Sequence, residues 1–328
     1  MNLVLKIIKL FPPEAAHSIA LYSLKILYQL RLINIFFPKL HDEELEVFGM
    51  TFANRLGTAA GLDKNGDFID CIGALGFGFV EVGTVTPKAQ LGNKKPRVFR
   101  IFKEEAIINR LGFNNKGVDY LVKRLKKRTF RGIVGVNIGA NKTSDGQKRI
   151  DDYIECFNKV ESYADYITVN ISSPNTPGLR DLHSSDNLKK LIGAIDKVIK
   201  ISGYKKSIFL KISPDENKES INEIIQIINN SFFTGLIISN TSIDKKILKD
   251  KKYHTYEGGL SGKPIMNKST ELLNLIYSND PSIPLIGVGG VMNNKDFQDK
   301  INSGAQLVQL YTGFVVKGPK IVADILKE

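Results

Sequence analysis

Cysteine and histidine are scarce in this 328-residue sequence, and neither is spaced for a metal or a disulfide framework. The two cysteines, Cys71 and Cys156, form no CxxC pair, which favours inert thiols in a reducing compartment. The four histidines are scattered and show no HExxH or similar ligand spacing. We therefore expect no metal site, and a chain of this length needs no disulfide to stabilise its core.

Signals of two common classes of binding protein are also missing. No GxGxxG stands between a predicted strand and a predicted helix, so a Rossmann-type nicotinamide or FAD site is not supported. The net charge of +12 is compatible with nucleic acid, an anionic membrane or anionic small molecules. No basic stretch with interleaved aromatic residues and no RNA-binding motif occurs. We therefore expect no nucleic-acid partner.

The first 40 residues are almost wholly apolar or basic, yet they contain no clean run of 18 apolar residues that would span a bilayer. They also lack the basic n-region and the small-residue cleavage site of a signal peptide. Two short helices in a membrane interface fit this composition, with Lys6, Lys9, Lys25 and Arg31 near anionic headgroups. A helical hairpin packed on the rest of the protein is the alternative interpretation.

From residue 50 onward, short β-rich runs alternate with helix-like segments. Strands that alternate with helices indicate right-handed parallel crossovers, and eight of them fit a closed (β/α)8 TIM barrel better than an open sheet. No linker divides this region, so we predict an N-terminal helical extension over residues 1–40 and one α/β barrel over residues 41–328. The predicted strands are 56–62, 79–86, 133–139, 166–172, 208–213, 235–241, 284–290 and 307–313.

Polar residues end many of these strands, where the active site of a barrel forms. Asn137, Asn170 and Lys211 stand inside otherwise apolar runs, and an unpaired polar group there would cost several kcal/mol. So many amides and lysines are difficult to explain by packing alone, and we expect a ligand site. The remaining strand-end residues of this kind are Lys64, Thr84, Ser239, Asn240 and Thr241.

The glycines indicate what the ligand is. GVGG (287–290) and YTG (311–313) end strands 7 and 8, where barrels commonly bind phosphate. GGLSGKP (258–264) adds glycines at which the backbone can come close to a ligand. Amides and Lys211 suit the edge of a planar heterocycle, and a lysine beside a flavin pyrimidine would stabilise the negative charge of its reduced form. Phosphate and flavin together predict FMN.

Six stretches resemble dihydroorotate dehydrogenase of the membrane-associated, quinone-dependent class 2, in order and over nearly the whole chain. They are AAGLDKNG (59–66), EVGTVTPKAQLGNKKPRVFR (81–100), INRLGFNN (108–115), VNISSPNTPGLR (169–180), GGLSGKP, and IGVGG with LVQLYTGF. The resemblance implies an FMN-binding barrel that oxidises dihydroorotate to orotate in pyrimidine biosynthesis. It also implies that a quinone, ubiquinone or menaquinone, takes the electrons and enters through residues 1–40.

The resemblance also implies roles for individual residues. Those expected at one bound FMN are Ala60, Gly61, Leu62, Asp63, Lys64, Thr84, Asn137, Asn170, Lys211, Ser239, Gly262, Gly290, Tyr311 and Thr312. Those expected at the substrate are Lys64, Asn109, Arg110, Leu111, Gly112, Phe113, Asn170, Asn175, Asn240 and Thr241. His17 and Arg100 match positions at the quinone pocket of the family. Pockets that bind apolar tails vary in sequence among its members.

In the mechanism that the resemblance implies, a base removes a proton from substrate carbon 5 while a hydride passes from carbon 6 to the flavin. Ser173 stands at the position of the base, where the soluble class 1 enzymes have cysteine. A serine hydroxyl ionises far above neutral pH, so it needs a relay, for which we expect Thr176 and a water shielded by Phe113. Ser172 is interpreted as structural.

Three other functions are compatible with parts of this pattern. A soluble FMN-dependent enzyme would use fumarate or NAD, but the apolar N-terminus and Ser173 argue against it. A dihydrouridine-synthase-like barrel would be expected to carry a catalytic cysteine and a further RNA-binding domain, and a non-catalytic scaffold would not need every site position filled. Without an Arg- and Ser-rich transit peptide, we expect a monomeric peripheral protein on the cytoplasmic face of a bacterial inner membrane.

Overall fold

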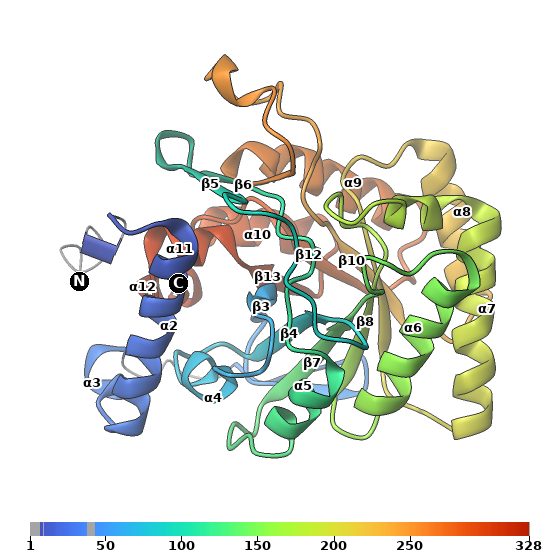
Figure 1. Cartoon of the computed structure of the whole chain (residues 1–328), viewed down its shortest axis with the longest axis horizontal. Coiled ribbons are helices and arrows are strands. Elements are labelled where there is room, and N and C mark those ends of the chain that lie inside the picture. The colour runs from blue at the N-terminus through green and yellow to red at the C-terminus, as the bar shows by residue number, and fades with distance from the viewer. Residues whose placement is uncertain (1–6, 9, 38–42, 328) are drawn as a thin grey trace.

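The structure is a computed structural model that describes residues 7–8, 10–37 and 43–327. Its centre is a closed barrel of parallel strands surrounded by helices, and within the described residues the barrel has eight strands (Figure 1). Each strand lies beside the next barrel strand along the chain, in the order β3, β4, β7, β8, β9, β10, β12 and β13. The (β/α)8 barrel that the sequence predicts is therefore confirmed.

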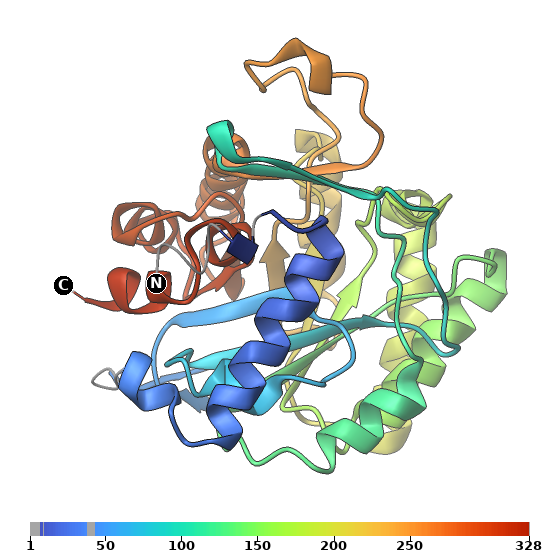
Figure 2. The same ribbon diagram turned by 60° about the vertical axis from the view of Figure 1, so that its left-hand side comes forward.

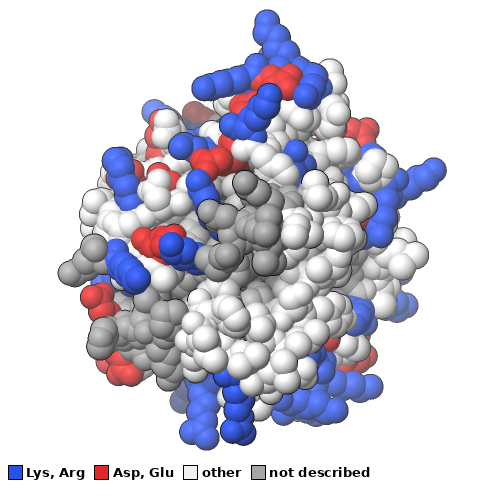
Figure 3. Space-filling model, turned by 90° about the vertical axis from the view of Figure 1, so that its left-hand side faces the viewer, with Lys and Arg blue, Asp and Glu red and all other residues white. Residues whose placement is uncertain are grey.

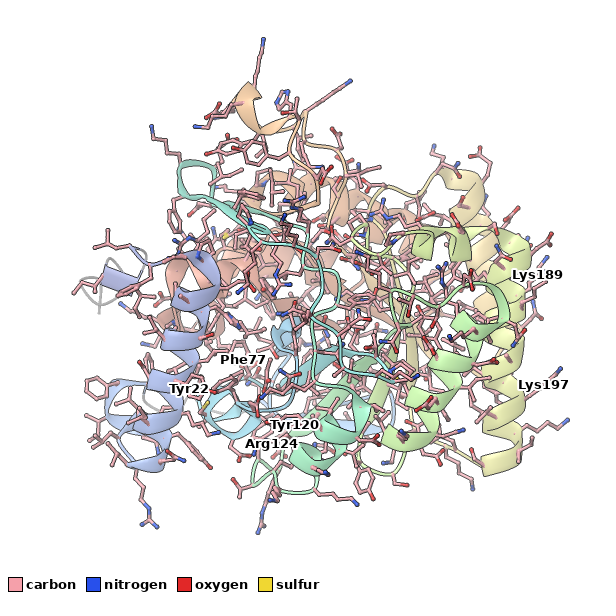
Figure 4. The ribbon with its side chains drawn as sticks, in the orientation of Figure 1. Tyr22, Phe77, Tyr120, Arg124, Lys189 and Lys197 are labelled. Carbon is pink, nitrogen blue, oxygen red and sulfur yellow. The ribbon has the colours of Figure 1, made fainter. Side chains whose placement is uncertain are left out.

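The barrel strands coincide with the eight predicted runs. They are β3 (Leu56–Asp63), β4 (Phe79–Val85), β7 (Ile133–Ile138), β8 (Tyr166–Asn170), β9 (Ile208–Ile212), β10 (Gly235–Ile238), β12 (Leu285–Val288) and β13 (Leu307–Leu310). The outer helices are α4 (Ile69–Gly73), α5 (Val118–Leu125), α6 (Gly146–Val160), α7 (Ser185–Ser202), α8 (Lys218–Asn229), α9 (Met266–Asn279), α10 (Asn294–Asn302), α11 (Thr312–Lys317) and α12 (Lys320–Leu326). Each longer helix buries one apolar stripe, so Lys189 and Lys197 project outward from α7 (Figure 4).

Aromatic rings fill the end of the barrel at which the strands begin. Phe79, Tyr166 and Phe209 are fully buried there and meet edge to face, with ring centroids 5.7–6.4 Å apart. A short antiparallel hairpin, β1 (Leu45–Val47) and β2 (Met50–Phe52), covers this end and adds Phe52, whose ring lies 5.4 Å from that of Phe79. The sequence analysis did not predict this hairpin. It leaves the opposite end of the barrel for ligands.

A second sheet lies over that opposite end. It pairs β5 (Val98–Ile101) with β6 (Ala106–Asn109) and β6 with β11 (Gly259–Gly262), all antiparallel. Short 3₁₀ turns η1 (Phe102–Glu104) and η4 (Lys263–Ile265) adjoin it, and η2 (Leu179–His183) follows β8. The charged loop before β11, with η3 (Lys251–Tyr253), projects from the body and is drawn in orange (Figure 1). This small sheet brings Asn109 and Gly262 to the mouth of the barrel.

The N-terminal helices dock on the side of the barrel. α2 (Pro13–Gln29) lies across it, followed by α3 (Ile33–Phe36), as Figure 2 shows. The buried guanidinium of Arg97 holds the Glu14 carboxylate at 2.7 Å, and this ion pair lowers the pKa of Glu14. Lys25 Nζ donates to the carbonyl of Asp67 at 3.1 Å. Lys25 therefore faces the barrel, which corrects its expected place near headgroups, while Lys6 and Lys9 lie outside the described residues.

The outer face of these helices is unusually apolar. Large hydrophobic side chains are exposed on it, although Leu21, Leu24 and Ile33 pack into the main core. Figure 3 shows a largely uncharged area over the lower middle of this face, with Lys and Arg along its lower edge. None of the described helices is long and apolar enough to cross a bilayer. The exposed hydrophobic residues between positions 7 and 36 are Ile7, Leu10, Phe11, Ile19, Tyr22, Ile26, Leu30, Ile35 and Phe36.

The aromatic layer under the barrel gives a stability prediction. Phe52→Ala removes a fully buried ring and leaves a cavity against Phe79, so we expect the free energy of unfolding to fall by about 3–5 kcal/mol. Thermal denaturation followed by circular dichroism measures the effect as a lower midpoint. Phe232→Ala is the matched control, because the Phe232 side chain is 58% exposed. Equal midpoints for the two variants would contradict the role of the hairpin in closing the barrel.

Candidate active site

A cavity of about 140 Å³ opens at the carboxyl ends of the barrel strands. The barrel geometry explains the convergence, because all eight parallel strands end at this edge. Most residues that the sequence analysis assigned to flavin or substrate line it. They are Ala60, Gly61, Lys64, Thr84, Asn109, Leu111, Gly112, Phe113, Asn170, Ser173, Asn175, Lys211, Ser239, Asn240, Thr241, Gly262, Gly290, Tyr311 and Thr312.

A row of amides crosses the floor of this cavity. Thr84 Oγ1 donates to Asn137 Oδ1 at 2.6 Å, and Asn170 Nδ2 contacts both Thr84 Oγ1 and Asn137 Oδ1. Asn240 Nδ2 continues the row to Asn170 Oδ1 at 3.2 Å and to Ser172 Oγ at 3.0 Å. The strands β4, β7 and β8 thus deliver one connected hydrogen-bond network. Such a network fixes the direction in which each amide presents its donor and acceptor.

A buried carboxylate anchors this row, and the sequence analysis missed it. Glu81 in β4 is fully buried and accepts from Asn137 Nδ2 at 2.9 Å. Its other oxygen accepts from the Tyr166 hydroxyl, Thr168 Oγ1 and Gln309 Nε2 at 2.6–3.1 Å. Four donors from three other strands therefore satisfy one charge inside the barrel. A lone acidic residue in an apolar strand is the signal that could have identified it.

Two lysines bring positive charge to the cavity. Lys211 in β9 is 5% exposed, and its Nζ donates no hydrogen bond to another described residue. Burial lowers the pKa of Lys211, while the Glu81 charge opposes that shift. Lys64 Nζ donates to the Gly61 carbonyl at 2.9 Å, and burial lowers the pKa of Lys64 to about 8. Both ammonium groups thus keep donors available for a ligand, and Lys64 is still mostly protonated at neutral pH.

Glycines line another wall of the cavity, where the backbone can approach a ligand closely. A Cβ on Gly290 would lie 2.4 Å from Met266 Cα, and one on Gly262 would lie 2.2 Å from the Glu105 carbonyl. Both have positive φ values, +86° and +99°, which only glycine adopts without strain. The N–H groups of Gly290, Thr312 and Gly313 donate no hydrogen bond within the described part of the chain. These free donors suit an anion such as phosphate.

The segment after β8 covers the amide row. Ser173 is 5% exposed, lines the cavity and accepts a 3.3 Å hydrogen bond from the Asn175 N–H. Thr176 Oγ1 is buried without a partner among the described residues, and Phe113 lines the same cavity. No hydrogen bond joins Ser173 to Thr176 in this part of the structure, so the expected relay through Thr176 stays a prediction.

Four predicted ligand residues lie outside the lining of this cavity. Asn137 is beneath it in the amide row, and Arg110 pairs with Glu257 at 2.7 Å. The Asp63 carboxylate accepts from the N–H groups of residues 65, 67 and 68, and burial raises the pKa of Asp63 to about 6. Leu62 is buried and faces the second cavity described below. Their direct contact with a ligand stays a prediction.

A second, mostly apolar cavity of about 440 Å³ lies between α2 and the barrel. Both residues predicted for the quinone, His17 and Arg100, line it. Burial lowers the pKa of His17 to about 4, so its imidazole is neutral at pH 7. Arg100 donates to the Phe11 carbonyl at 2.6 Å. The two cavities adjoin, because four residues line both of them: Lys64, Asn109, Leu111 and Tyr311.

Comparison with known proteins agrees with this site. The family model described as dihydroorotate dehydrogenase matches residues 43–328. The chain belongs to the dihydroorotate dehydrogenase family. It is 45% identical to the dihydroorotate dehydrogenase (quinone) of Saccharophagus degradans over 95% of this chain and 93% of that protein. The enzyme of the same name from Aeromonas salmonicida is 46% identical over 96% of each chain.

Solved structures give the same result. The dihydroorotate dehydrogenase of Eimeria tenella in complex with ferulenol superposes with a TM-score of 0.85 and 33% identity, over 95% of this chain and 89% of that chain. The ligand-free form of the same enzyme gives a TM-score of 0.83 and 34% identity, over 94% and 92%. The chain therefore shares the fold of these dihydroorotate dehydrogenases along nearly its whole length.

The Glu81 network predicts a large effect from a small change. Glu81→Gln keeps the shape but turns an acceptor oxygen into a donor that opposes the groups around it. We expect the free energy of unfolding to fall by about 3 kcal/mol, because charge-assisted hydrogen bonds are lost and buried donors stay unpaired. Denaturant titration measures this free energy of unfolding. Glu271→Gln on the exposed side of α9 is the control, and a Glu81→Gln midpoint equal to that control would contradict the anchoring role.

Proposed function

We propose that this protein oxidises dihydroorotate to orotate in pyrimidine biosynthesis, with FMN as prosthetic group and a membrane quinone as acceptor. The observation that carries the proposal is the pair of adjoining cavities, one polar and one apolar, that share Lys64 and Tyr311. A polar cavity suits the substrate and the flavin head, whereas an apolar one suits a quinone. The named relatives support this assignment, because they are quinone-dependent dihydroorotate dehydrogenases.

The residues of the barrel mouth fit FMN. Lys211 lacks a partner within the described structure and would face the flavin edge, and the free N–H groups near Gly290 and Thr312 would hold its phosphate. Thr84, Asn170 and Ser239 would contact the ring system from below. When bound, FMN supplies a two-electron acceptor that passes electrons onward one or two at a time. Gly61, beside Tyr311, leaves room for the ring, since a Cβ there would lie 3.2 Å from the Tyr311 side chain.

The remaining lining residues fit the substrate, a carboxylate with imide edges. Lys64 would balance the carboxylate. Asn175 Oδ1 and Thr241 Oγ1 are buried polar atoms without a partner in the described structure, and both residues line the cavity. Asn175 Nδ2 donates to Asn109 Oδ1 at 3.1 Å, which aims its oxygen away from Asn109. These two unpaired oxygens would accept hydrogen bonds from substrate N–H groups, because leaving them unpaired costs free energy.

Ser173 is the proposed base. It is the hydroxyl of the loop after β8 that lines the cavity, and it sits beside the substrate residue Asn175. Ser172 instead accepts from Asn240 Nδ2 and contacts Asn170 Oδ1, which makes it a support for the amide row. Ser173 would take the proton from the substrate carbon and pass it toward Thr176 and solvent. Phe113 would shield that path.

The apolar cavity would admit the quinone along α2. Arg100 would donate to a quinone oxygen, and the His17 imidazole, neutral at pH 7, would line the same cavity. The exposed hydrophobic residues of α2 and α3 would lie in the interface of the membrane, which delivers a water-insoluble quinone directly to this cavity. We propose a monomeric peripheral protein on the cytoplasmic face of a bacterial inner membrane, with residues 1–40 as the membrane-facing segment.

The choice of acceptor tests this function. The purified chain receives dihydroorotate with decyl-ubiquinone, fumarate or NAD in turn, and orotate formation is followed by its absorbance. We expect turnover with the quinone alone. Preferential turnover with fumarate or NAD would favour the soluble class instead, and no flavin spectrum at all would reject FMN.

Ser173→Ala tests the base. We expect flavin reduction by dihydroorotate to slow by about 10²–10⁴-fold, the usual contribution of a general base, while FMN content stays normal. Stopped-flow absorbance measures the rate. Ser184→Ala is the matched control, since the Ser184 hydroxyl is exposed and bonds only the Asp181 carbonyl. A normal rate in Ser173→Ala would assign the proton to another group.

Ala20→Trp tests the quinone cavity. Ala20 lines it, so an indole at this position would fill space that the quinone needs. We expect the KM for decyl-ubiquinone to rise by about tenfold or more, equal to a loss of about 1.4 kcal/mol. Flavin reduction by dihydroorotate should keep its rate. Ala15→Trp on the same helix is the control, because Ala15 is exposed and is not part of the cavity lining; equal KM values in the two variants would place the quinone elsewhere.

A further inference from the structure

We propose that Lys300 is a positioning residue for the phosphate end of the bound flavin: it holds the Gly289–Gly290 peptide through Ser269 and adds a buried positive charge behind it. This inference rests on the proposed FMN site. None of the roles assigned above uses Lys300, which lies on α10 and does not line either cavity.

Lys300 is a buried cation without an acidic partner. Its side chain is fully buried, and no carboxylate of the described residues lies within 4.0 Å of Nζ. Its stem packs on Gly287 of β12, where a Cβ would lie 3.4 Å from Lys300 Cβ and Cδ. Burial lowers the pKa of Lys300 to about 7, although the charges of Asp296 and Asp299 oppose the shift, so about half of the Lys300 side chains are protonated at pH 7 before an anion binds. A buried charge of this kind needs a compensating group or a bound anion.

One hydroxyl connects Lys300 to the ligand wall. Lys300 Nζ donates to Ser269 Oγ, and Ser269 Oγ lies 3.1 Å from the Gly289 carbonyl and 3.2 Å from that of Met266. An ammonium has only donors, so Ser269 must accept from Lys300 and donate its single proton to a carbonyl. When Lys300 is protonated, the chain therefore runs from Lys300 through Ser269, whose one proton is shared between the carbonyl of Gly289 in the glycine loop and that of Met266 at the start of α9.

This chain determines where the Gly290 N–H points. The Gly289–Gly290 peptide is planar and trans, so its carbonyl and its N–H point in opposite directions. Because Ser269 holds the carbonyl on the side of α9 and α10, the N–H of Gly290 turns toward the cavity, where it has no partner within the described residues. Gly290 itself lines that cavity. Lys300 therefore orients a free donor and polarises the peptide that carries it.

The phosphate group is the part of FMN that would respond to this arrangement. A phosphate carries between one and two negative charges at pH 7, and low-dielectric surroundings strengthen its attraction to a cation that it does not touch. Riboflavin has the same ring system and ribityl chain without the phosphate. A charge and a donor aimed at the phosphate should distinguish the two flavins, whereas a purely structural lysine would affect both alike.

The experiment compares FMN and riboflavin affinities of the full-length chain after its flavin is removed. Fluorescence quenching gives the Kd values for the wild type, Lys300→Met and Ser269→Ala. We expect Lys300→Met to weaken FMN by about 10–100-fold, with riboflavin changed by less than about twofold. Ser269→Ala should weaken FMN alone, by a smaller factor. Lys295→Met, an exposed lysine on the same helix, should change neither.

Three results separate the possibilities. Equal weakening of both flavins in Lys300→Met and Ser269→Ala would overturn the inference and leave Lys300 a packing residue. If Lys300→Met does not fold, as judged by circular dichroism, Ser269→Ala decides: loss of FMN affinity alone supports the inference, and equal loss overturns it. A wild-type chain that binds neither flavin would instead reject the proposed FMN site on which the inference rests.

Discussion

The interior of this barrel depends on one buried carboxylate. Glu81 receives hydrogen bonds from β7, β8 and β13, and through Asn137 it sets the orientation of Thr84, Asn170 and Asn240 at the mouth. An isolated charge in this position would be prohibitively costly, so the four donors around it and the nearby Lys211 are required together. The same carboxylate thus pairs the buried donors inside the barrel and orients the polar side chains on which the flavin and the substrate are proposed to bind.

The N-terminal helix α2 is part of the apolar cavity. α2 forms one wall of the apolar cavity, and the Glu14–Arg97 ion pair fixes it against the segment that leads into β5. The polar and apolar cavities meet at Lys64, Asn109, Leu111 and Tyr311, so two reactants of opposite polarity could reach the proposed flavin from different sides. This separation suits an enzyme that receives its reductant from water and its oxidant from a membrane.

Local signals predicted the barrel and the polar residues and glycines at its strand ends, whereas the resemblance implied other lining residues such as Asn109, Phe113 and Asn175. The sequence did not predict the β1–β2 hairpin, whose strands have only three residues each, or the sheet of β5, β6 and β11, in which β6 pairs with a strand about 150 residues further along the chain. It also passed over Glu81 and Lys300, since a single charge in an apolar run shows its partners only after folding. The resemblance to dihydroorotate dehydrogenase supplied the residue roles, which the fold by itself does not assign.

The most direct test of the two-cavity account measures whether product and acceptor bind at the same time. Calorimetric titration of orotate into the oxidised, FMN-containing enzyme gives its Kd with and without a saturating concentration of decyl-ubiquinone. Because the two ligands are assigned to different cavities, the account predicts Kd values that agree within about twofold. An orotate Kd that rises in proportion to the quinone concentration would show competition for one site and would contradict the account.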